Sequence, residues 1–190
     1  MTEDALTIRP LAYDELGRVA EIDRTEQIDL IYVQHGAELE ERPGDWSAPA
    51  WELDGDSEHS VVTHTRDLED DVDAGGVALG VFDGDRLVGI GAVVPHLRPG
   101  IAQLAWLHVT AGRRDAGIGS RLCETLEDIA RDAGDQRIVV SATPSEHTIT
   151  FYRRRGYEPM AEPLAELVER EPDDIHLEKV LESAAAGGQE

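Results

Sequence analysis

The sequence predicts a single domain of the α/β (α+β) class, built on one mixed, mostly antiparallel sheet that is flanked by helices. Two observations lead to this prediction. Two apolar runs enclose Asp83-Gly84-Asp85, and an Asp-Gly pair between such runs is a strong β-hairpin signal. Strand-like and helix-like segments then alternate without an internal repeat, in a chain of 190 residues that is short for two domains. We expect the domain to cover residues 1–182 and a flexible tail to cover residues 183–190.

The first part of the chain has the weaker signals. Residues 6–10 predict a short strand that a proline closes, and residues 12–32 carry apolar side chains at helical spacing. Periodicity is lost over residues 35–60, where prolines, glycines and acidic residues favour a loop with a helical turn or two. A polar, acidic helix is expected over residues 63–76, because a glycine pair ends it.

The second part is more regular. A strand over residues 101–109 follows the hairpin, and a helix over residues 117–133 has its apolar side chains on one face and Gly134 as its stop. A further strand is expected over residues 136–142. The next helix has Thr143 as its expected N-cap, followed by proline and, three residues after the cap, by glutamate. The last strands are expected over residues 157–169 and 173–181.

The charge of the chain excludes several partners. There are 40 acidic and 17 basic residues, a net charge of -23, so a nucleic acid would be repelled. No apolar run approaches the roughly 20 residues that a membrane-spanning helix needs. The N-terminus lacks the apolar segment of a secretory signal, and the single cysteine, Cys123, fits a reducing compartment. We therefore expect a cytoplasmic protein with neither nucleic-acid nor membrane partners.

The basic residues are unusual, since sixteen are arginines and one, Lys179, is a lysine. An acidic surface almost without lysine resembles proteins of halophilic archaea, in which carboxylates keep the surface hydrated in concentrated KCl. An acidic protein of a mesophile is the alternative.

The stretch "RRDAGIGSRL" gathers arginines and glycines at the start of a predicted helix. A P-loop is excluded, because Ile118 stands where that motif requires lysine. A dinucleotide fingerprint fits poorly, since Leu122 takes the place of the third glycine. The third interpretation is an anion site, in which Arg114, Gly117 and Gly119 leave the first helical N–H groups open to a pyrophosphate. The alternative is that the glycines only allow close packing of the helix on the sheet.

The context of this stretch favours the anion site. The segment "LHVTAGRRDAGIGSRLCETLEDIA", followed by a strand and by "FYRRRGY", resembles the GCN5-related N-acetyltransferase (GNAT) family. It matches the family's Arg/Gln-x-x-Gly-x-Gly/Ala acyl-CoA loop and its helix that ends in Tyr-x-x-x-Gly-Phe/Tyr. The resemblance covers residues 77–157 well, the first strand and helix loosely, and residues 35–60 hardly at all.

The resemblance implies a splayed pair of strands that holds acetyl-CoA. The strand that ends at Val109 would separate from the strand over residues 137–142, and the pantetheine arm would lie in the gap like an added strand. Backbone N–H groups of the loop would hold the pyrophosphate, and Ser145 replaces an asparagine that is common in the family. The implied cofactor-binding residues are Leu107, His108, Val109, Arg114, Asp115, Ala116, Gly117, Ile118, Gly119, Ser120 and Ser145.

Tyr152 is the implied catalytic residue, since a tyrosine at this position can protonate the leaving CoA thiolate. The alternative is a packing role beside Phe151. The general base stays open: the strand before the loop offers Gln103 and His108 where the family often has a glutamate. His108 has a suitable ordinary pKa but is also consistent with a core or surface role. Acidic residues of the first helical region that could act through water are Glu21, Asp23 and Glu26.

The distribution of charge supports a polyanion site independently of the resemblance. Residues 113–155 hold eight arginines and seven acidic residues, a net of +1, whereas the rest of the chain carries -24. Arg113 or Arg114 is expected to contact phosphate, and residues 153–155 are either phosphate contacts or ordinary partners of a helix C-terminus.

Together these features predict an acyl-CoA-dependent N-acetyltransferase that acetylates a primary amine by direct attack. The acceptor would be a small molecule or peptide, no metal is expected because the histidines show no ligand spacing, and Cys123 is expected to be a buried apolar residue. We expect a monomer or a homodimer. The alternatives are a non-catalytic acyl-CoA sensor and an interaction module that docks a partner through Trp46 and Trp51. In the family, the irregular segment that contains these tryptophans covers the acceptor site.

Overall fold

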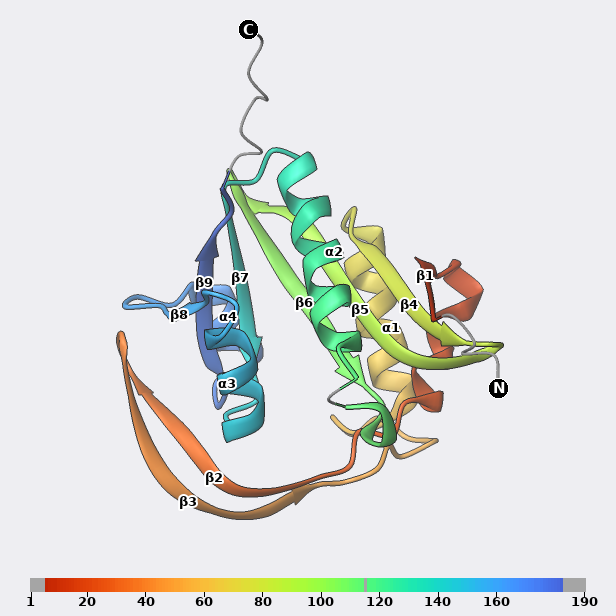
Figure 1. Ribbon diagram of the computed structural model, residues 1–190, viewed down its shortest axis with the longest axis horizontal. Helices are drawn as coiled ribbons and strands as arrows, with labels where there is room; N and C mark the ends of the chain where they lie inside the picture. The colour runs from red at the N-terminus through yellow and green to blue at the C-terminus, as the bar shows by residue number, and fades with distance from the viewer. Residues whose placement is uncertain (1–5, 115, 183–190) are drawn as a thin grey trace, which may run out of the picture.

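One seven-stranded sheet runs through the molecule, with the strand order β1-β4-β5-β6-β7-β9-β8 (Figure 1). This computed structural model describes residues 6–114 and 116–182, so the expected tail over residues 183–190 lies outside the described residues. Neighbouring strands are antiparallel except β6 and β7, which confirms the predicted mixed sheet. The strands are β1 Thr7–Pro10, β4 Val77–Asp83, β5 Arg86–Arg98, β6 Ile101–Val109, β7 Arg137–Ala142, β8 Glu158–Pro159 and β9 Ile175–Val180.

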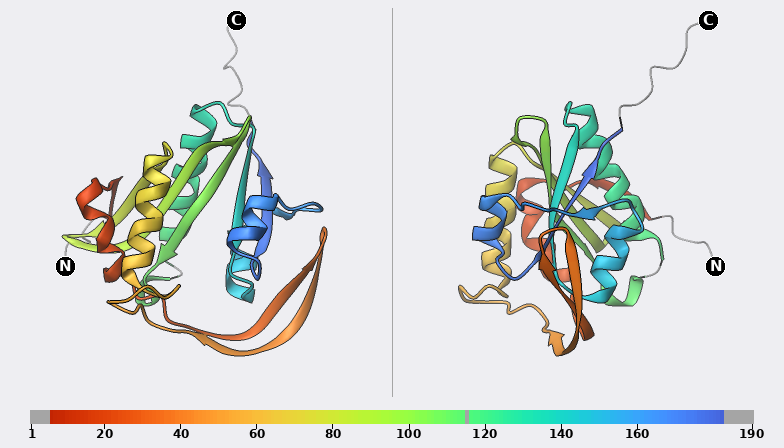
Figure 2. Two further views of the ribbon diagram at one scale, coloured as in Figure 1. Left: turned by 180° about the vertical axis from the view of Figure 1, so that it is seen from behind. Right: turned by 90° about the vertical axis from the view of Figure 1, so that its left-hand side faces the viewer.

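Helices cover both faces of this sheet (Figure 2). The 3-10 helix η1 and helix α1 bury Leu16 and Leu68 against one face, together with Trp106 of β6. Helices α2 and α3 bury Leu122 and Ile149 against the other face. The helices are η1 Tyr13–Glu21, α1 Val61–Asp73, η2 Ala111–Arg113, α2 Ile118–Asp132, α3 Glu146–Arg153 and α4 Ala165–Arg170.

The hairpin turn and the helix start that the sequence predicts in the middle of the chain are confirmed. Strands β4 and β5 pair from Asp83 and Arg86 around a two-residue turn, in which Gly84 has a φ of 59°. Such a left-handed backbone favours glycine, which explains the Asp-Gly signal. Helix α2 begins after Gly117, whose φ is 74°.

Strands β6 and β7 separate after a short parallel pairing. Their register runs only from Ile101 opposite Arg137 to Gln103 opposite Val139. At the same point β6 acquires a bulge against β5, since consecutive β5 residues pair with Trp106 and Leu104. A bulge bends its strand and increases the local twist, so the register change accompanies the split. The splayed strand pair implied by the resemblance is therefore present.

A second, two-stranded sheet replaces two elements that the sequence predicted otherwise. β2 Glu26–His35 and β3 Glu38–Ala48 form an antiparallel hairpin, so the expected helix over residues 12–32 ends early, and the expected loop over residues 35–60 is strand as far as Ala48 and irregular after it. The helical spacing was misleading because only Ile28 of β2 is fully buried. The side chains of β2 mostly line a cavity and are not in the core, which removes the strict alternation of a half-buried strand.

This hairpin, which we call the strap, bridges the two separated strands (Figure 1). At one end the N–H of Ala111 donates to the carbonyl of Asp23 over 2.8 Å. At the other end the N–H of Tyr32 donates to the carbonyl of Pro144 over 2.8 Å, and the Gln34 side chain donates to the carbonyl of Met160 over 2.9 Å. The strap therefore closes one side of the gap.

Two smaller expectations are wrong. Ser145, and not Thr143, is the N-cap of α3, because its hydroxyl accepts the N–H of Thr148 over 3.2 Å. The segment expected as a strand over residues 157–169 contains only the two residues of β8 and then helix α4. Leu167 of α4 packs into a small apolar cluster with Val139, so helical packing decides the conformation there.

A polar cluster is buried beneath α2. Glu127, which is 4% exposed, accepts hydrogen bonds from the Tyr157 hydroxyl at 3.0 Å and from the Lys179 ammonium at 2.6 Å. Cys123 lies beside it, and burial together with the nearby Glu127 charge raises the pKa of its thiol to about 12. The cysteine is therefore the buried small residue that the sequence predicts, and a nucleophilic thiolate is excluded at neutral pH.

Candidate active site

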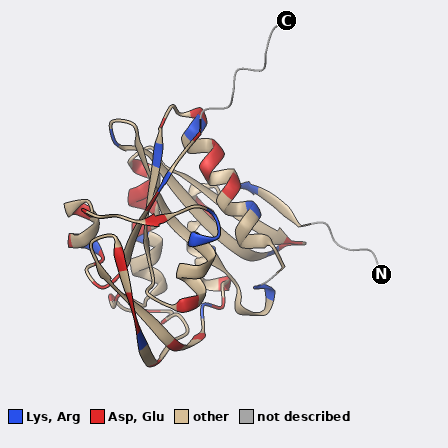
Figure 3. Cartoon of the chain, turned by 60° about the vertical axis from the view of Figure 1, so that its left-hand side comes forward, with Lys and Arg blue, Asp and Glu red and all other residues tan. Residues whose placement is uncertain are grey.

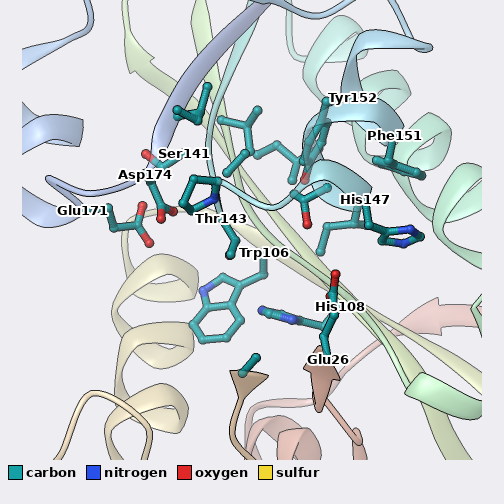
Figure 4. A pocket seen from close by; sticks show the side chains of 18 of the residues that line it. Glu26, Trp106, His108, Ser141, Thr143, His147, Phe151, Tyr152, Glu171 and Asp174 are labelled. Carbon is teal, nitrogen blue, oxygen red and sulfur yellow. The ribbon is translucent and has the colours of Figure 1, made fainter. Parts of the chain in front are cut away.

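The gap between β6 and β7 opens into one large cavity of about 1690 Å³. Pockets for a single small ligand usually enclose roughly 300–1,000 Å³, so this cavity has room for two substrates. Residues of β6, β7, α3 and the strap line it, and Tyr152, His108 and Asp174 face it from different sides (Figure 4).

The strand edges along the gap are available for a ligand. Beyond Gln103 the described part of β6 pairs with β5 alone, and β7 beyond Val139 pairs with β9 alone. Backbone N–H and C=O groups therefore line both sides of the opening. An extended amide-containing chain can satisfy them as an added strand would.

The predicted anion site lies at one end of the gap. Gly117, Gly119 and Ser120 line the cavity at the N-terminus of α2, where N–H groups have no helical partner. A Cβ on Gly119 would lie 3.4 Å from the Phe151 ring and 3.5 Å from Val109, which is ordinary contact. Close packing therefore does not require glycine at this position, and the packing alternative loses its main argument.

The two arginines before the loop are engaged elsewhere. Arg113 forms an ion pair with Asp83. The Arg114 guanidinium donates to the carbonyls of Thr25 at 3.0 Å and Arg24 at 3.2 Å, so it fastens the strap to the loop. Their side chains thus have protein partners, and only the backbone of this stretch is free to meet a phosphate.

Other arginines are better placed for a polyanion. Arg154 and Arg155 of the α3 terminus line the cavity. The Arg155 guanidinium lies 4.2 Å from the centre of the Phe151 ring, and its Nε is buried without a hydrogen-bond partner among the described residues. An unsatisfied buried donor of positive charge is what a phosphate ligand would complete.

Tyr152 occupies the centre of the site. Its ring packs edge-on against Phe151 and Tyr157, and the residue is 4% exposed. No hydrogen bond to its hydroxyl occurs within the described part of the chain, although the side chain lines the cavity. Burial raises the pKa of Tyr152 well above its ordinary value, so the hydroxyl stays protonated and can donate a proton.

An aromatic wall faces Tyr152 from the other side of the gap. The rings of Trp51, His64, Trp106 and His108 contact one another at centroid distances from 4.5 to 5.8 Å. Trp46 of β3 also lines the cavity, so both tryptophans of the irregular segment border the site. The Trp106 indole N–H donates to Asp71 over 3.0 Å, which fixes this wall to α1.

His108 of this wall lines the cavity. Burial lowers the pKa of its imidazole to about 4, and the positive charge of Arg24 acts in the same direction.

Two carboxyl groups border the cavity beside this wall. Glu171 and Asp174 come from the loop between α4 and β9 and lie close to Ser141 of β7 (Figure 4). Sequence reasoning missed them, because Asp174 was expected within the strand over residues 173–181 and Glu171 in the connection before it. The run of three acidic residues around that proline was the available signal.

The structure brings most of the predicted site residues together. Those that line the cavity are Leu107, His108, Val109, Arg114, Gly117, Gly119, Ser120 and Tyr152. Ile118 is a core residue, Ala116 is exposed outside the lining, and the Ser145 hydroxyl is occupied as a helix cap. Asp115 lies outside the described residues.

The residues considered as general bases differ in whether they line the cavity and in whether they already have partners. Gln103 is buried outside the lining, and Glu21 is bound by Arg18 and by the N–H of Leu87. Asp23 accepts from Thr25. The last of them, Glu26, lines the cavity, with one carboxylate oxygen 3.5 Å from the Arg114 guanidinium.

Two searches of the described residues gave negative results. Within residues 6–114 and 116–182 there is no group of three or more potential ligands that could hold a metal ion. None of the described helices is long and apolar enough to cross a membrane.

The sheet is thus split between two parallel strands, with a glycine-rich helix start at one end of the gap and a buried tyrosine at its centre. Residues 39–157, more than half of the chain, match the acetyltransferase (GNAT) family, so the chain belongs to this family. It is an acyl-CoA-dependent N-acyltransferase.

Similar solved structures share this fold across nearly the whole chain. Nourseothricin acetyltransferase superposes with a TM-score of 0.69 at 15% identity, covering 94% of this chain and 99% of that one. A putative streptothricin acetyltransferase from Bacillus anthracis, in complex with acetyl coenzyme A, gives 0.64 at 14% identity, with coverage of 93% and 99%. PaiA N-acetyltransferase from Thermoplasma acidophilum, in complex with coenzyme A, gives 0.59 at 16%, again covering 93% and 99%. No curated protein sequence matches the chain.

Proposed function

We propose that this enzyme transfers an acetyl group from acetyl-CoA to a primary amine of a small cationic acceptor. The observation that carries the proposal is the open pair of strand edges, which leads from the N-terminus of α2 to the Tyr152 hydroxyl. A pantetheine arm fits those edges, and its pyrophosphate would lie on the N–H groups from Arg114 to Ser120, near Arg155. In this position the pantetheine arm would contact Leu107, His108 and Val109 of β6.

The reaction that this geometry supports is direct attack. The lone pair of the deprotonated amine forms the new C–N bond at the thioester carbonyl, whose developing negative charge meets backbone N–H groups of β6 near Val109. The C–S bond then breaks, and Tyr152 donates its hydroxyl proton to the departing sulfur. No protein-bound acyl group is required, which agrees with the buried, protonated state of Cys123.

The charges of the cavity support a cationic acceptor. On the α3 side the cavity is lined by two arginines, Arg154 and Arg155, and one acid, Glu146. Toward the aromatic wall the acids Asp67, Glu171 and Asp174 outnumber the bases Arg24 and Arg170. Acidic residues also outnumber basic ones over the whole chain, 40 to 17, and Figure 3 marks residues of both kinds on the described part of the chain. A polyanionic donor and a cationic acceptor would thus find opposite charges at opposite ends of one cavity.

The test is release of free CoA thiol in the presence of acetyl-CoA and a panel of amines. The panel contains spermidine, a lysine-bearing peptide, nourseothricin and an aminoglycoside, the last two because acetyltransferases for them share the fold. Amine-dependent thiol release supports the proposal. Binding of acetyl-CoA without turnover of any amine would favour the alternative, a non-catalytic acyl-CoA sensor. Sedimentation of the same sample would distinguish a monomer from a homodimer.

We also propose that the enzyme works in a cytoplasm of high salt concentration, as in halophilic archaea. The support is compositional: 40 acidic residues accompany a single lysine. At high net charge, self-repulsion opposes folding and salt screens it. The midpoint of thermal unfolding should therefore rise strongly between dilute buffer and multimolar KCl, and an unchanged midpoint would contradict this proposal.

A further inference from the structure

The loop between α4 and β9 places two carboxyl groups with different surroundings at the cavity. Burial raises the pKa of Glu171. The Ser141 hydroxyl and the positive charge of Arg170 act in the opposite direction, although the net shift is upward. Asp174 has neither a hydrogen bond nor an ion pair to any described side chain. The Glu171 side chain likewise has no hydrogen bond or ion pair to a described side chain, since Arg170 pairs with Asp71 and Ser141 lies against His176, so both carboxylates are left free.

The surroundings of the Asp174 carboxyl group disfavour its charged form. Burial, followed by the negative charges of Glu171 and Asp173, raises the pKa of Asp174 to about 7. A carboxyl group that is half-buried among like charges without a partner is costly for stability and is typical of functional sites. The charged and titratable groups around this loop are Tyr152 of α3, Arg170 of α4, Asp67 and Asp71 of α1, His176 of β9, and the loop residues Glu171 and Asp173.

Other polar groups at the same cavity also lack partners. His176 is 3% exposed and lines the cavity, yet its Nε2 has no hydrogen bond to the described residues while its Nδ1 lies 3.1 Å from Ser141. The Tyr152 hydroxyl also has no hydrogen bond to the described residues. The two carboxyl groups thus belong to a lining of unsatisfied polar atoms that a polar ligand would complete.

Two candidate bases on the opposite side of the cavity, His108 and Glu26, differ from Asp174 in their surroundings. The imidazole of His108, with a pKa of about 4, is a weak base. The Glu26 carboxylate is already engaged in an ion pair with Arg114. A base works best when its pKa lies near the working pH, a condition that Asp174 meets.

We propose that Asp174 is the general base that takes the proton from the acceptor ammonium, and that Glu171 holds this ammonium beside it. This inference rests on the proposed function. The proton moves from the ammonium nitrogen to a carboxylate oxygen of Asp174, and the freed lone pair forms the C–N bond as the C–S bond breaks. Tyr152 supplies the proton to sulfur as the C–S bond breaks, and the amide nitrogen gives its second proton back to the Tyr152 oxygen. Between turnovers Asp174 releases its proton to solvent.

The first test compares Asp174→Asn and Glu171→Gln with Glu169→Gln, which removes the same charge from an exposed position of α4. The kcat/KM for the best amine of the panel is measured from about pH 6 to pH 9.5. At about pH 7, Asp174→Asn should lose roughly 100-fold or more. The loss should shrink as pH approaches the amine's own pKa, because a neutral amine needs no base.

The matched variants separate the two roles. Glu171→Gln should raise KM for the amine by about 10-fold or more with kcat largely retained, as for a lost contact to a charge. Glu169→Gln should behave as the wild type, and all three should bind acetyl-CoA equally. A deficit of Asp174→Asn that stays constant with pH, or one below about 3-fold, would overturn the proposal, since a purely structural role has no such pH dependence.

A second measurement needs no acceptor. In protein labelled with ¹³C at the aspartate carboxyl carbons, one resonance should titrate near pH 7 and be missing in Asp174→Asn. Absence of such a resonance overturns the proposal. Failure of the proposed function would look different, because the wild-type protein would then release no CoA thiol with any amine of the panel.

Discussion

Gly119→Glu tests whether the glycine-rich start of α2 is an anion site. Gly119 is the second residue of α2, and the nearest atoms to an added Cβ lie 3.4 to 3.6 Å away, in Phe151 and Val109. A side chain is therefore accommodated by the fold but enters the cavity. A carboxylate about 4 Å from a phosphate costs about 1 kcal/mol if water screens it fully and about 4 kcal/mol at a protein surface.

These energies correspond to a roughly 5-fold to 1,000-fold loss of acetyl-CoA affinity. Isothermal titration of acetyl-CoA, CoA and NADH into wild type and variant measures it, and the wild type should bind both CoA forms and ignore NADH. Gly119→Ala is the matched variant for folding, since alanine in place of a helical glycine stabilises by about 0.5–1 kcal/mol. Gly112→Glu, in open space on the same loop, should lose little affinity. Unchanged acetyl-CoA binding by folded Gly119→Glu would refute the anion site.

Three further predictions concern single side chains. Tyr152→Phe should keep the fold and acetyl-CoA affinity but lower kcat by about 10²–10⁴-fold, which steady-state kinetics would measure; an unchanged kcat would leave Tyr152 a packing residue. Lys179→Met should lower the free energy of unfolding by about 2–4 kcal/mol in a urea titration, because the buried Glu127 carboxylate loses its ion pair. This range is smaller than for a fully buried pair, since the lysine is partly exposed, and a loss under about 1 kcal/mol would contradict the prediction. Asp174 has a folded-state pKa of about 7, above its ordinary 3.8, so the stability associated with its protonated form is lost as pH rises through 7. Asp174→Asn should accordingly resist urea better than wild type at about pH 8 and equally at about pH 4, and equal midpoints at both values would argue against the raised pKa.

The core of the fold was predictable where local signals and burial agree. The β4–β5 turn needs a glycine with positive φ, and α2 buries one apolar face, so the sequence pattern and the structure follow from the same constraints. The strap lacked such agreement, because it spans an opening and its side chains line a cavity. Period and composition report burial in a core, and they are silent about a strand that covers a substrate site.

The site shows the same division. The loop glycines and Tyr152 belong to a contiguous motif, so the sequence predicted their place in the cavity. Asp174 lies far along the chain from that motif and comes near it only because β9 pairs with β7. The side chain of Arg114, expected at a phosphate, instead binds the carbonyls of Arg24 and Thr25, just before the strap. Partners that depend on tertiary contacts between distant segments leave no local pattern to find.

The buried ion pair beneath α2 bears on how this enzyme tolerates its own donor. Thioesters acylate exposed lysine side chains without any catalyst, and an acetyltransferase meets its thioester donor continuously. This chain offers that side reaction a single ε-amine, Lys179, whose nitrogen lies 2.6 Å from Glu127. Arginine supplies nearly all of its other positive charge, and a guanidinium does not lose its proton at physiological pH. Chemical self-acetylation therefore has almost no lysine to reach, and mass spectrometry after prolonged incubation with acetyl-CoA should find the lysine side chain of the folded enzyme unmodified.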